Sequence, residues 1–282
     1  KFIYCSDPVY MGGPALQESN MTEMEFIGRF LESNIDYARD KFRDRDSLTV
    51  TSKKNASDLL TEVDLTLQKR AVEQIRAAFP GDEIVAEEGE YSKLPAHPNA
   101  RCWVMDPIDG TNNFVRGVFP VFAISLAFAI HGRTVAAGMA LPGNGDIYQA
   151  EEGKGATING KRLLVSQVQA LGEARLDLDF GGVEDREAWL ERGKELISQG
   201  GQLRCYGSAV SALAQVASGD MDAFVHMTLN PWDYAAGMLV VEEAGGMCSR
   251  LDGKPLRLFD GKAGVLISNG AIHKEILRLI RR

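Results

Sequence analysis

The order of helix-period and strand-period segments restricts this chain to a layered fold that mixes helices and sheets. Apolar residues recur at helical spacing in two early segments, 27–38 and 64–79. Short strand-like segments follow, and strands alternate with helices from about residue 174 onwards. We therefore expect a mixed α/β architecture in which helices cover the faces of sheets.

The middle of the chain predicts an antiparallel meander. Two apolar runs between Val121 and Ala140 flank His131-Gly132-Arg133, which is a hairpin signal. The strands expected after this hairpin are 146–152, 156–160, 161–166, 174–180, 222–227 and 263–268, and the expected helices are 185–198, 208–217 and 233–244. No linker composition divides these segments. We expect residues 21–282 to form one unit with two closely packed halves, about 21–170 and about 171–282.

The first 20 residues differ from the rest of the chain. They show no helical or strand period, and they lack the basic start and long apolar core of a signal peptide. The segment MTEMEFIGRFLE, from Met21, is typical of a natural start that runs into a helix. We therefore expect residues 1–20 to be a non-native leader or an extended start.

Charge and composition argue against several classes of function. The chain has 31 Lys and Arg against 39 Asp and Glu, a net charge of −8 and no extended basic run, which argues against nucleic-acid binding. The longest apolar run, 118–130, is interrupted by Pro120 and Ser125 and is too short to span a bilayer. Four scattered cysteines without a CxxC pair indicate neither a zinc site nor a disulfide framework, so we expect a cytoplasmic location.

Two aspartates lie three positions apart in the segment WVMDPIDGTNNF, 103–114. Pro107 fixes one backbone dihedral between Asp106 and Asp109, and Gly110 permits a tight turn directly after them. Such a turn can aim both carboxylates and the Ile108 carbonyl at one point. The strand-like segments DEIVAEE and RCWVMD also end in acidic residues, at strand ends where chains emerge to build sites.

Converging carboxylates require a cation. Two like charges about 4 Å apart repel by about 4 kcal/mol at an effective dielectric near 20. If Glu87, Glu88 and a downstream aspartate converge with these two aspartates, they could not share a point unaided. An all-oxygen donor set without histidine or cysteine suits Mg²⁺ or a similar hard ion much better than zinc. A solvated acidic turn is the alternative interpretation of a single DxxDG.

Other phosphate and metal motifs fit the chain poorly. The proline and the aspartate spacing do not match an EF-hand, and a haloacid-dehalogenase-type phosphatase separates its aspartates by one residue instead of two. The segment GKGATING, 153–160, lacks the third glycine of a dinucleotide loop. Ser208 lacks the GxSxG frame of a nucleophilic serine.

Three motifs in order resemble one enzyme family. AEEGE (86–90), WVMDPIDGTNNF and NPWDYAAGMLVVEEAGG (230–246) together are similar to the inositol monophosphatase family of metal-dependent, lithium-sensitive sugar and inositol phosphatases. The resemblance covers about residues 53–246. It implies a layered α-β-α-β-α sandwich of the inositol monophosphatase and fructose-1,6-bisphosphatase type, with phosphoric monoester hydrolase activity.

The resemblance also implies a metal-ligand set. One Mg²⁺ would be bound by Glu87, Asp106 and the Ile108 carbonyl, and a second by Asp106, Asp109 and Asp233. Glu87 would also contact a weakly held third ion, and it belongs to the expected catalytic residues. Bound Mg²⁺ would activate a water and let an acidic protein accept an anionic substrate.

Further residues match the family in catalysis or phosphate binding. Asp64 and Thr111 resemble the pair that positions and deprotonates the attacking water. Lys53 resembles a lysine near the metals, and the backbone amides of Gly110 and Thr111 resemble phosphate ligands. The simpler alternatives are a helix cap at Asp64, a solvated charge at Lys53 and a supporting role for Glu88.

Residues beyond the metals decide the substrate. Inositol-specific members carry a glutamate seven positions before the last motif aspartate, whereas this chain has His226, which weakens myo-inositol phosphate as the sole substrate. Gly207, Ser208 and Ala209 match a stretch that lines the sugar pocket. His226 is therefore either a substrate contact or a strand-end histidine without one.

We expect a Mg²⁺-dependent phosphatase that acts on a small polyol or sugar phosphate. Fructose-1,6-bisphosphate, histidinol phosphate and 3'-phosphoadenosine compounds are alternative substrates on the same fold. A non-catalytic, phospholigand-binding regulatory protein is an alternative of another class, although a pure binder needs no pair that activates water. The resemblance implies a homodimer, and we expect neither nucleic acid nor membrane as a partner.

Overall fold

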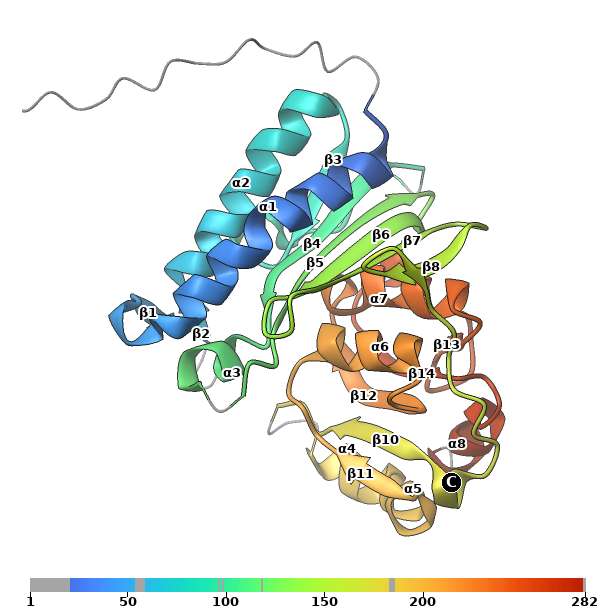
Figure 1. Ribbon diagram of the computed structural model, residues 1–282. Helices are drawn as coiled ribbons and strands as arrows, with labels where there is room; N and C mark the ends of the chain where they lie inside the picture. The colour runs from blue at the N-terminus through green and yellow to red at the C-terminus, as the bar shows by residue number, and fades with distance from the viewer. Residues whose placement is uncertain are drawn as a thin grey trace, which may run out of the picture.

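The computed structural model describes residues 21–53, 59–95, 97, 99–117, 119–182 and 186–280, with residue 188 described by its backbone only. The expected leader, residues 1–20, lies outside the described residues. The described chain forms five layers in the order α-β-α-β-α (Figure 1). The layered α/β architecture expected from the sequence is confirmed.

Two long helices form the first layer, α1 (Glu23–Arg43) and α2 (Glu62–Ala78). Thr22 and Glu25 form a capping box that begins α1, and Thr61 and Asp64 form another that begins α2. The apolar faces of both helices pack on one side of the first sheet, as their helical spacing predicts.

The first sheet has seven strands in sequence order: β3 (Glu83–Ala86), β4 (Arg101–Asp109), β5 (Ala123–Ile130), β6 (Arg133–Leu141), β7 (Asp146–Glu151), β8 (Gly155–Ile158) and β9 (Lys161–Arg162). β3 and β4 are parallel, and the others form the expected antiparallel meander. The strand expected at 161–166 ends early, because Leu163 and Val165 turn into the central core and the Val165 amide donates to the Ala244 carbonyl.

The second sheet is mixed and has the order β11 (Gln202–Arg204), β10 (Arg175–Asp179), β12 (Ala223–Leu229), β14 (Ala263–Ser268) and β13 (Met247–Arg250). Helices α6 (Ala209–Ser218) and α7 (Pro231–Glu243) lie between the two sheets and share one apolar core with both. The outer layer contains α4 (Arg186–Arg192), α5 (Lys194–Gln199) and α8 (His273–Ile280).

Most helix ends lie within two residues of the sequence expectation, and two differences have a clear physical reason. The helix expected at 185–198 is two helices that meet at Gly193, where a Cβ atom would lie 2.3 Å from the Trp189 ring. Helix α7 begins at Pro231 instead of Asp233, because proline suits the first helical position and Asn230 caps the helix.

The remaining elements are short. These segments were expected from the sequence as connections and not as helices or strands. The strands β1 (Val50–Ser52) and β2 (Leu59–Thr61) form a separate pair, α3 (Thr111–Arg116) follows β4, and 3-10 turns occupy Arg45–Ser47, Gly89–Ser92, Leu171–Glu173 and Leu258–Asp260. Among the described residues, no helix combines the length and apolar character that crossing a membrane requires.

Candidate functional site

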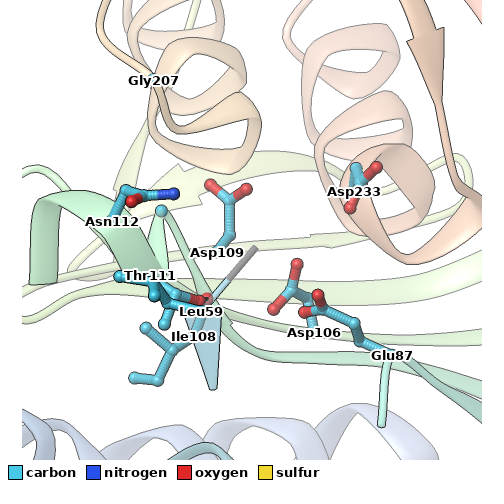
Figure 2. A pocket seen from close by; sticks show the side chains of 10 residues that line it. Leu59, Glu87, Asp106, Ile108, Asp109, Thr111, Asn112, Gly207 and Asp233 are labelled. Atoms are coloured by element: carbon cyan, nitrogen blue, oxygen red, sulfur yellow. Dashed lines mark hydrogen bonds between the residues drawn. The ribbon is translucent and has the colours of Figure 1, made fainter. Parts of the chain in front are cut away.

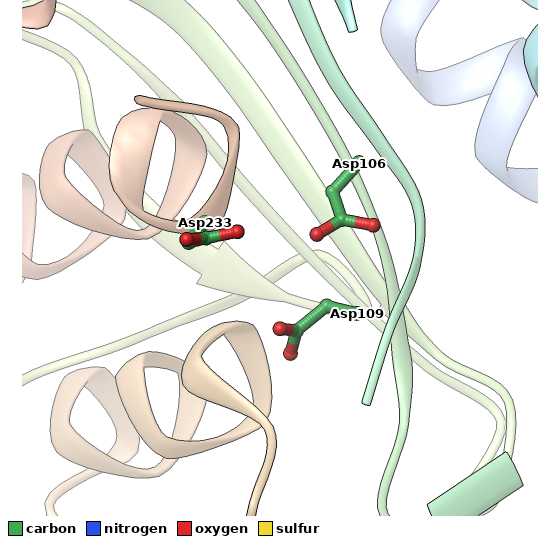
Figure 3. Close-up of side chains that lie close together, drawn as sticks. All are labelled: Asp106, Asp109 and Asp233. Carbon is green, nitrogen blue, oxygen red and sulfur yellow. The ribbon is translucent and has the colours of Figure 1, made fainter. Parts of the chain in front are cut away.

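Strand β4 contains a bulge between its two aspartates. Asp106 pairs with Ser125 of β5 and Asp109 pairs with Ala123, so three steps on β4 match two steps on β5. Residues three apart on a regular strand point to opposite faces, and the bulge instead turns both carboxylates toward the layer of α6 and α7 (Figure 3). The sequence predicted a strand end at Asp106 and a turn at Gly110; the strand instead continues to Asp109, and the turn begins at Gly110 as expected.

Gly110 lets the chain leave β4 beneath helix α6. Its φ of +85° is in the left-handed region, and a Cβ atom would lie 3.0 Å from the Ser208 Cβ and 3.1 Å from the Val121 carbonyl oxygen. Both the backbone conformation and the close approach therefore require glycine. Thr111 then begins α3 with its side chain beside the bulge.

Helix α7 brings a third carboxylate to the two on β4. The Asn230 amide donates to Asp233 Oδ2 at 2.7 Å, which places Asp233 in the capping box at the start of the helix. Carboxylate oxygens of Asp106, Asp109 and Asp233 lie within 4.8 Å of one another (Figure 3). Three acids from two separate elements thus converge, as expected for a cation site.

These acids open into a pocket of about 220 Å³. Glu87, at the end of β3, points its carboxylate toward Asp106 (Figure 2). The pocket is lined by Leu59, Glu87, Asp106, Ile108, Asp109, Gly110, Thr111, Asn112, Gly207 and Asp233. All five metal ligands implied by the resemblance lie in this one lining.

The electrostatics of the pocket favour a bound cation. Burial, with repulsion from the neighbouring acids, raises the pKa of Asp106 and of Asp233 well above the usual range. Burial also raises the pKa of Asp109 to about 7, although hydrogen bonds from Ser208 and Val210 lower it. Asp106 Oδ1 is buried and has no hydrogen-bond partner among the described residues. An unpaired buried oxygen within an all-oxygen cluster fits a hard divalent cation.

Asp64 and Thr111 lie together beside the pocket. The Thr61 amide donates to Asp64 Oδ2 at 2.9 Å, and the Thr111 hydroxyl lies 3.4 Å from Asp64 Oδ1 and 2.9 Å from the Ile108 carbonyl oxygen. Burial raises the pKa of Asp64 to about 6, although its bonds from Thr61 lower it. Asp64 therefore caps α2 with one oxygen and faces Thr111 with the other.

Lys53 lies between two glutamates instead of in solvent. Its Nζ lies 2.8 Å from Glu87 Oε1 and also contacts Glu88. Burial alone would lower the pKa of Lys53, but the two carboxylates raise it. Burial raises the pKa of Glu88 to about 7, and Gln68 binds the Glu88 backbone with bonds of 2.8 and 3.0 Å. Glu88 thus supports Lys53 from behind the pocket.

The expected substrate residues separate into two groups. Gly207 lines the pocket, whereas Ser208 and Ala209 begin helix α6, and the Ser208 hydroxyl points at Asp109. His226 is buried in β12, with Nε2 3.7 Å from Asp179 Oδ1 and Nδ1 accepting from the Thr228 amide at 3.0 Å. The pocket lining includes none of Ser208, Ala209 and His226, because hydrogen bonds or register turn these residues elsewhere.

Two supporting residues were missed by sequence reasoning. Gln68 follows Asp64 by four positions on the same face of α2, a spacing that could have identified it. The Asn113 amide donates to the Tyr206 and Val121 carbonyl oxygens at 2.7 and 2.9 Å. The bond to Tyr206 joins α3 to a loop more than 90 positions away in the sequence. No local sequence pattern indicates this contact.

Comparison with known proteins identifies the family and the fold. The sequence pattern described as the inositol monophosphatase family matches residues 29–282. A fructose-1,6-bisphosphatase/inositol-1-monophosphatase of Thermotoga maritima is 37% identical over 235 residues, which cover 82% of this chain and 86% of that protein. Nus factor SuhB of Pseudomonas aeruginosa is 36% identical over 246 residues, covering 85% and 90%. A solved IMPase structure from Thermotoga maritima has a TM-score of 0.79 at 34% identity and covers 93% of this chain and 97% of its own.

Proposed function

The chain belongs to the inositol monophosphatase family, and we propose that it is a Mg²⁺-dependent phosphatase that hydrolyses a small polyol or sugar phosphate monoester. The observation that carries the proposal is the convergence of four carboxylates on one pocket, next to the Asp64 and Thr111 pair. A protein that only bound a phosphorylated ligand would need the cation but not the pair.

The metal ligands in this proposal are Glu87, Asp106, the Ile108 carbonyl, Asp109 and Asp233, for two ions with a third near Glu87. Bound Mg²⁺ supplies acidified water and neutralises the charge that develops on the phosphate and the leaving oxygen.

The remaining residues position the reactants. The Thr111 hydroxyl orients the attacking water, and Asp64 accepts its proton, a role that a carboxyl pKa of about 6 suits near neutral pH. Gly110 and Thr111 line the pocket, and in this proposal their backbone amides donate to phosphate oxygens. Hydrolysis then depends mainly on position and charge, because phosphoryl transfer needs little covalent work from the protein.

The leaving group enters on the Gly207 side of the pocket in this proposal. The names of the relatives support inositol 1-phosphate and fructose 1,6-bisphosphate as substrates. Inhibition by Li⁺ and assembly as a homodimer rest on the family resemblance, and inhibition assays and light scattering would test them.

A second candidate function has one specific observation in its favour. The relative named Nus factor SuhB is 36% identical to this chain, so a regulatory role through protein contacts is the alternative. The two functions are compatible, since one fold can carry more than one function.

The experiment is a phosphate-release assay with and without Mg²⁺. The panel contains inositol 1-phosphate, fructose 1,6-bisphosphate, histidinol phosphate and adenosine 3',5'-bisphosphate. We expect Mg²⁺-dependent release from at least one of the first two compounds. Release from none of the panel would refute the phosphatase proposal and leave the regulatory alternative.

A further inference from the structure

The N-terminus of helix α6 holds a carboxylate from another element. Ser208 is the N-cap of α6, and its hydroxyl oxygen accepts from the Ser211 amide at 3.3 Å. The same hydroxyl donates to Asp109 Oδ2, and the Val210 amide donates to that oxygen at 2.9 Å. One oxygen of Asp109 is therefore bound twice by the start of α6.

This contact restricts how Asp109 faces the pocket. Two donors hold Oδ2, and the Ala209 amide also bonds to this carboxylate, so Asp109 cannot rotate freely where it faces Asp106 and Asp233. Asp64 and Asp233 receive equivalent bonds from the caps of their own helices, at Thr61 and Asn230. Asp109 ends a strand, so its support has to come from elsewhere.

The hydrogen bonds of Ser208 leave no capacity for substrate. A hydroxyl has one proton, and here that proton lies on the bond to Asp109. Its oxygen accepts from the Ser211 amide at 3.3 Å and lies 2.7 Å from the Ser211 hydroxyl oxygen. The side chain is 3% exposed and lies outside the pocket lining.

Two functions of this hydroxyl can be separated. Capping α6 uses the oxygen as an acceptor, whereas holding Asp109 uses the proton as a donor. A glycine at an N-cap position preserves much of a helix's stability but supplies no donor. The substitution Ser208→Gly can therefore remove the bond to Asp109 with little effect on the helix.

We propose that Ser208 is a positioning residue that orients Asp109 for metal binding and does not contact the substrate. This inference rests on the proposed function, in which Asp109 is a metal ligand. It assigns to Ser208 a role different from the sugar contact that the family resemblance implies.

The test is direct titration of the purified full chain with Mn²⁺, with free Mn²⁺ measured by electron paramagnetic resonance and Mg²⁺ added as a competitor. We expect Ser208→Ala and Ser208→Gly each to weaken metal binding about 10-fold, the size typical of residues that support a metal ligand. Ser208→Thr keeps the hydroxyl and should restore binding to near the wild-type value. Phosphate release should show a raised Mg²⁺ requirement with the KM for substrate unchanged at saturating Mg²⁺.

The matched control is Thr22→Ala. This substitution removes the side-chain hydroxyl that caps α1. Helix α1 begins at the opposite end of β4 from Asp109, where Glu23 pairs with Arg101. We expect this variant to bind Mn²⁺ as the wild type does. Equal losses in Thr22→Ala and Ser208→Gly would overturn the inference, because loss of helix capping would then explain both.

Other outcomes are equally decisive. Wild-type metal binding in both Ser208→Ala and Ser208→Gly, or a raised KM with unchanged metal affinity, would overturn the positioning role while leaving the phosphatase proposal intact. A wild-type chain that binds no Mn²⁺ and releases no phosphate would refute the proposed function and this inference with it.

Discussion

Two of the regions that bury carboxylates among the described residues have different surroundings, and we propose a cation site in only one of them. Asp106 on β4 and Asp177 on β10 are 2% and 1% exposed, and both bury oxygens without a hydrogen bond of normal geometry among the described residues. Burial raises the pKa of Asp106 well above its usual range and that of Asp177 to about 7, although the Tyr206 amide lowers the latter.

The neighbours make the difference between these regions. Asp106 shares an open pocket with Asp109, Asp233 and Glu87. Asp177 pairs in register with Phe224 of β12 and has Asp179 as its charged neighbour on the same strand. A buried acid alone is thus no evidence for a metal, whereas several acids around a shared space are.

The largest expected effect is on kcat, which should fall when an acid of the pocket is substituted and not when Asp177 is. Asp109→Asn should lower kcat about 1,000-fold, because a neutral amide replaces an anionic ligand of the cation that stabilises the transition state. Asp177→Asn, the same change in the other region, should leave kcat within about threefold. Phosphate release at saturating Mg²⁺ measures both. Similar losses in the two variants would show that the comparison is wrong.

Metal addition should stabilise one region only. Mg²⁺ at about 100 times its Kd should raise the free energy of unfolding by about 3 kcal/mol in the wild type and in Asp177→Asn. Asp106→Asn should lose most of this increase, because the unpaired oxygen at the pocket is replaced. Chemical denaturation in EDTA and in Mg²⁺ gives the values, and full Mg²⁺ stabilisation of Asp106→Asn would contradict the ligand assignment.

The pH dependence of stability should identify Asp177. An acid whose folded-state pKa is about 7, against about 4 when unfolded, keeps its proton on folding, so ionisation opposes folding increasingly from about pH 4 to pH 7. The advantage of Asp177→Asn over the wild type should therefore be near zero at pH 4 and reach about 4 kcal/mol at pH 8. Denaturant titrations across this range provide the test, and a difference independent of pH would exclude the ionisation explanation.

The smallest expected effect on stability concerns Arg204, the cationic side chain paired with Asp177 on the neighbouring strand. Arg204 pairs with Asp177 across β10 and β11, but its guanidinium donates to the Leu203 carbonyl and to Gln202 in an exposed position. Arg204→Ala should change the free energy of unfolding by less than about 0.5 kcal/mol. A loss of several times this size would mean that Arg204 neutralises Asp177.

Local sequence patterns predicted much of the fold and the acidic half of the site. The three motifs predicted the family, which is confirmed. Asp64 and Asp233 are identifiable because each is the acid of a capping box, with its partner three residues earlier. Asp106 and Asp109 are marked by the proline and glycine next to them, although the bulge depends on the register with β5.

Long-range contacts account for what the sequence did not predict. Ser208 and Asp109 are 99 positions apart, and only the packed helix α6 brings the hydroxyl to the carboxylate. The direction of His226 follows from the parallel pairing of β10 and β12, which sets it beside Asp179. The break at Gly193 similarly depends on where the Trp189 ring packs.

The three helix starts around the pocket also bear on how the chain reaches its native state. The N-cap amides of α2 and α7, Thr61 and Asn230, donate to Asp64 and Asp233, and the Val210 amide in the first turn of α6 donates to Asp109. Each helix start carries the equivalent of about half a positive charge, so the three dipoles together oppose part of the repulsion among the acids. We therefore expect the acids to reach their native positions during folding without a bound ion, so that metal binds to a site that is already formed.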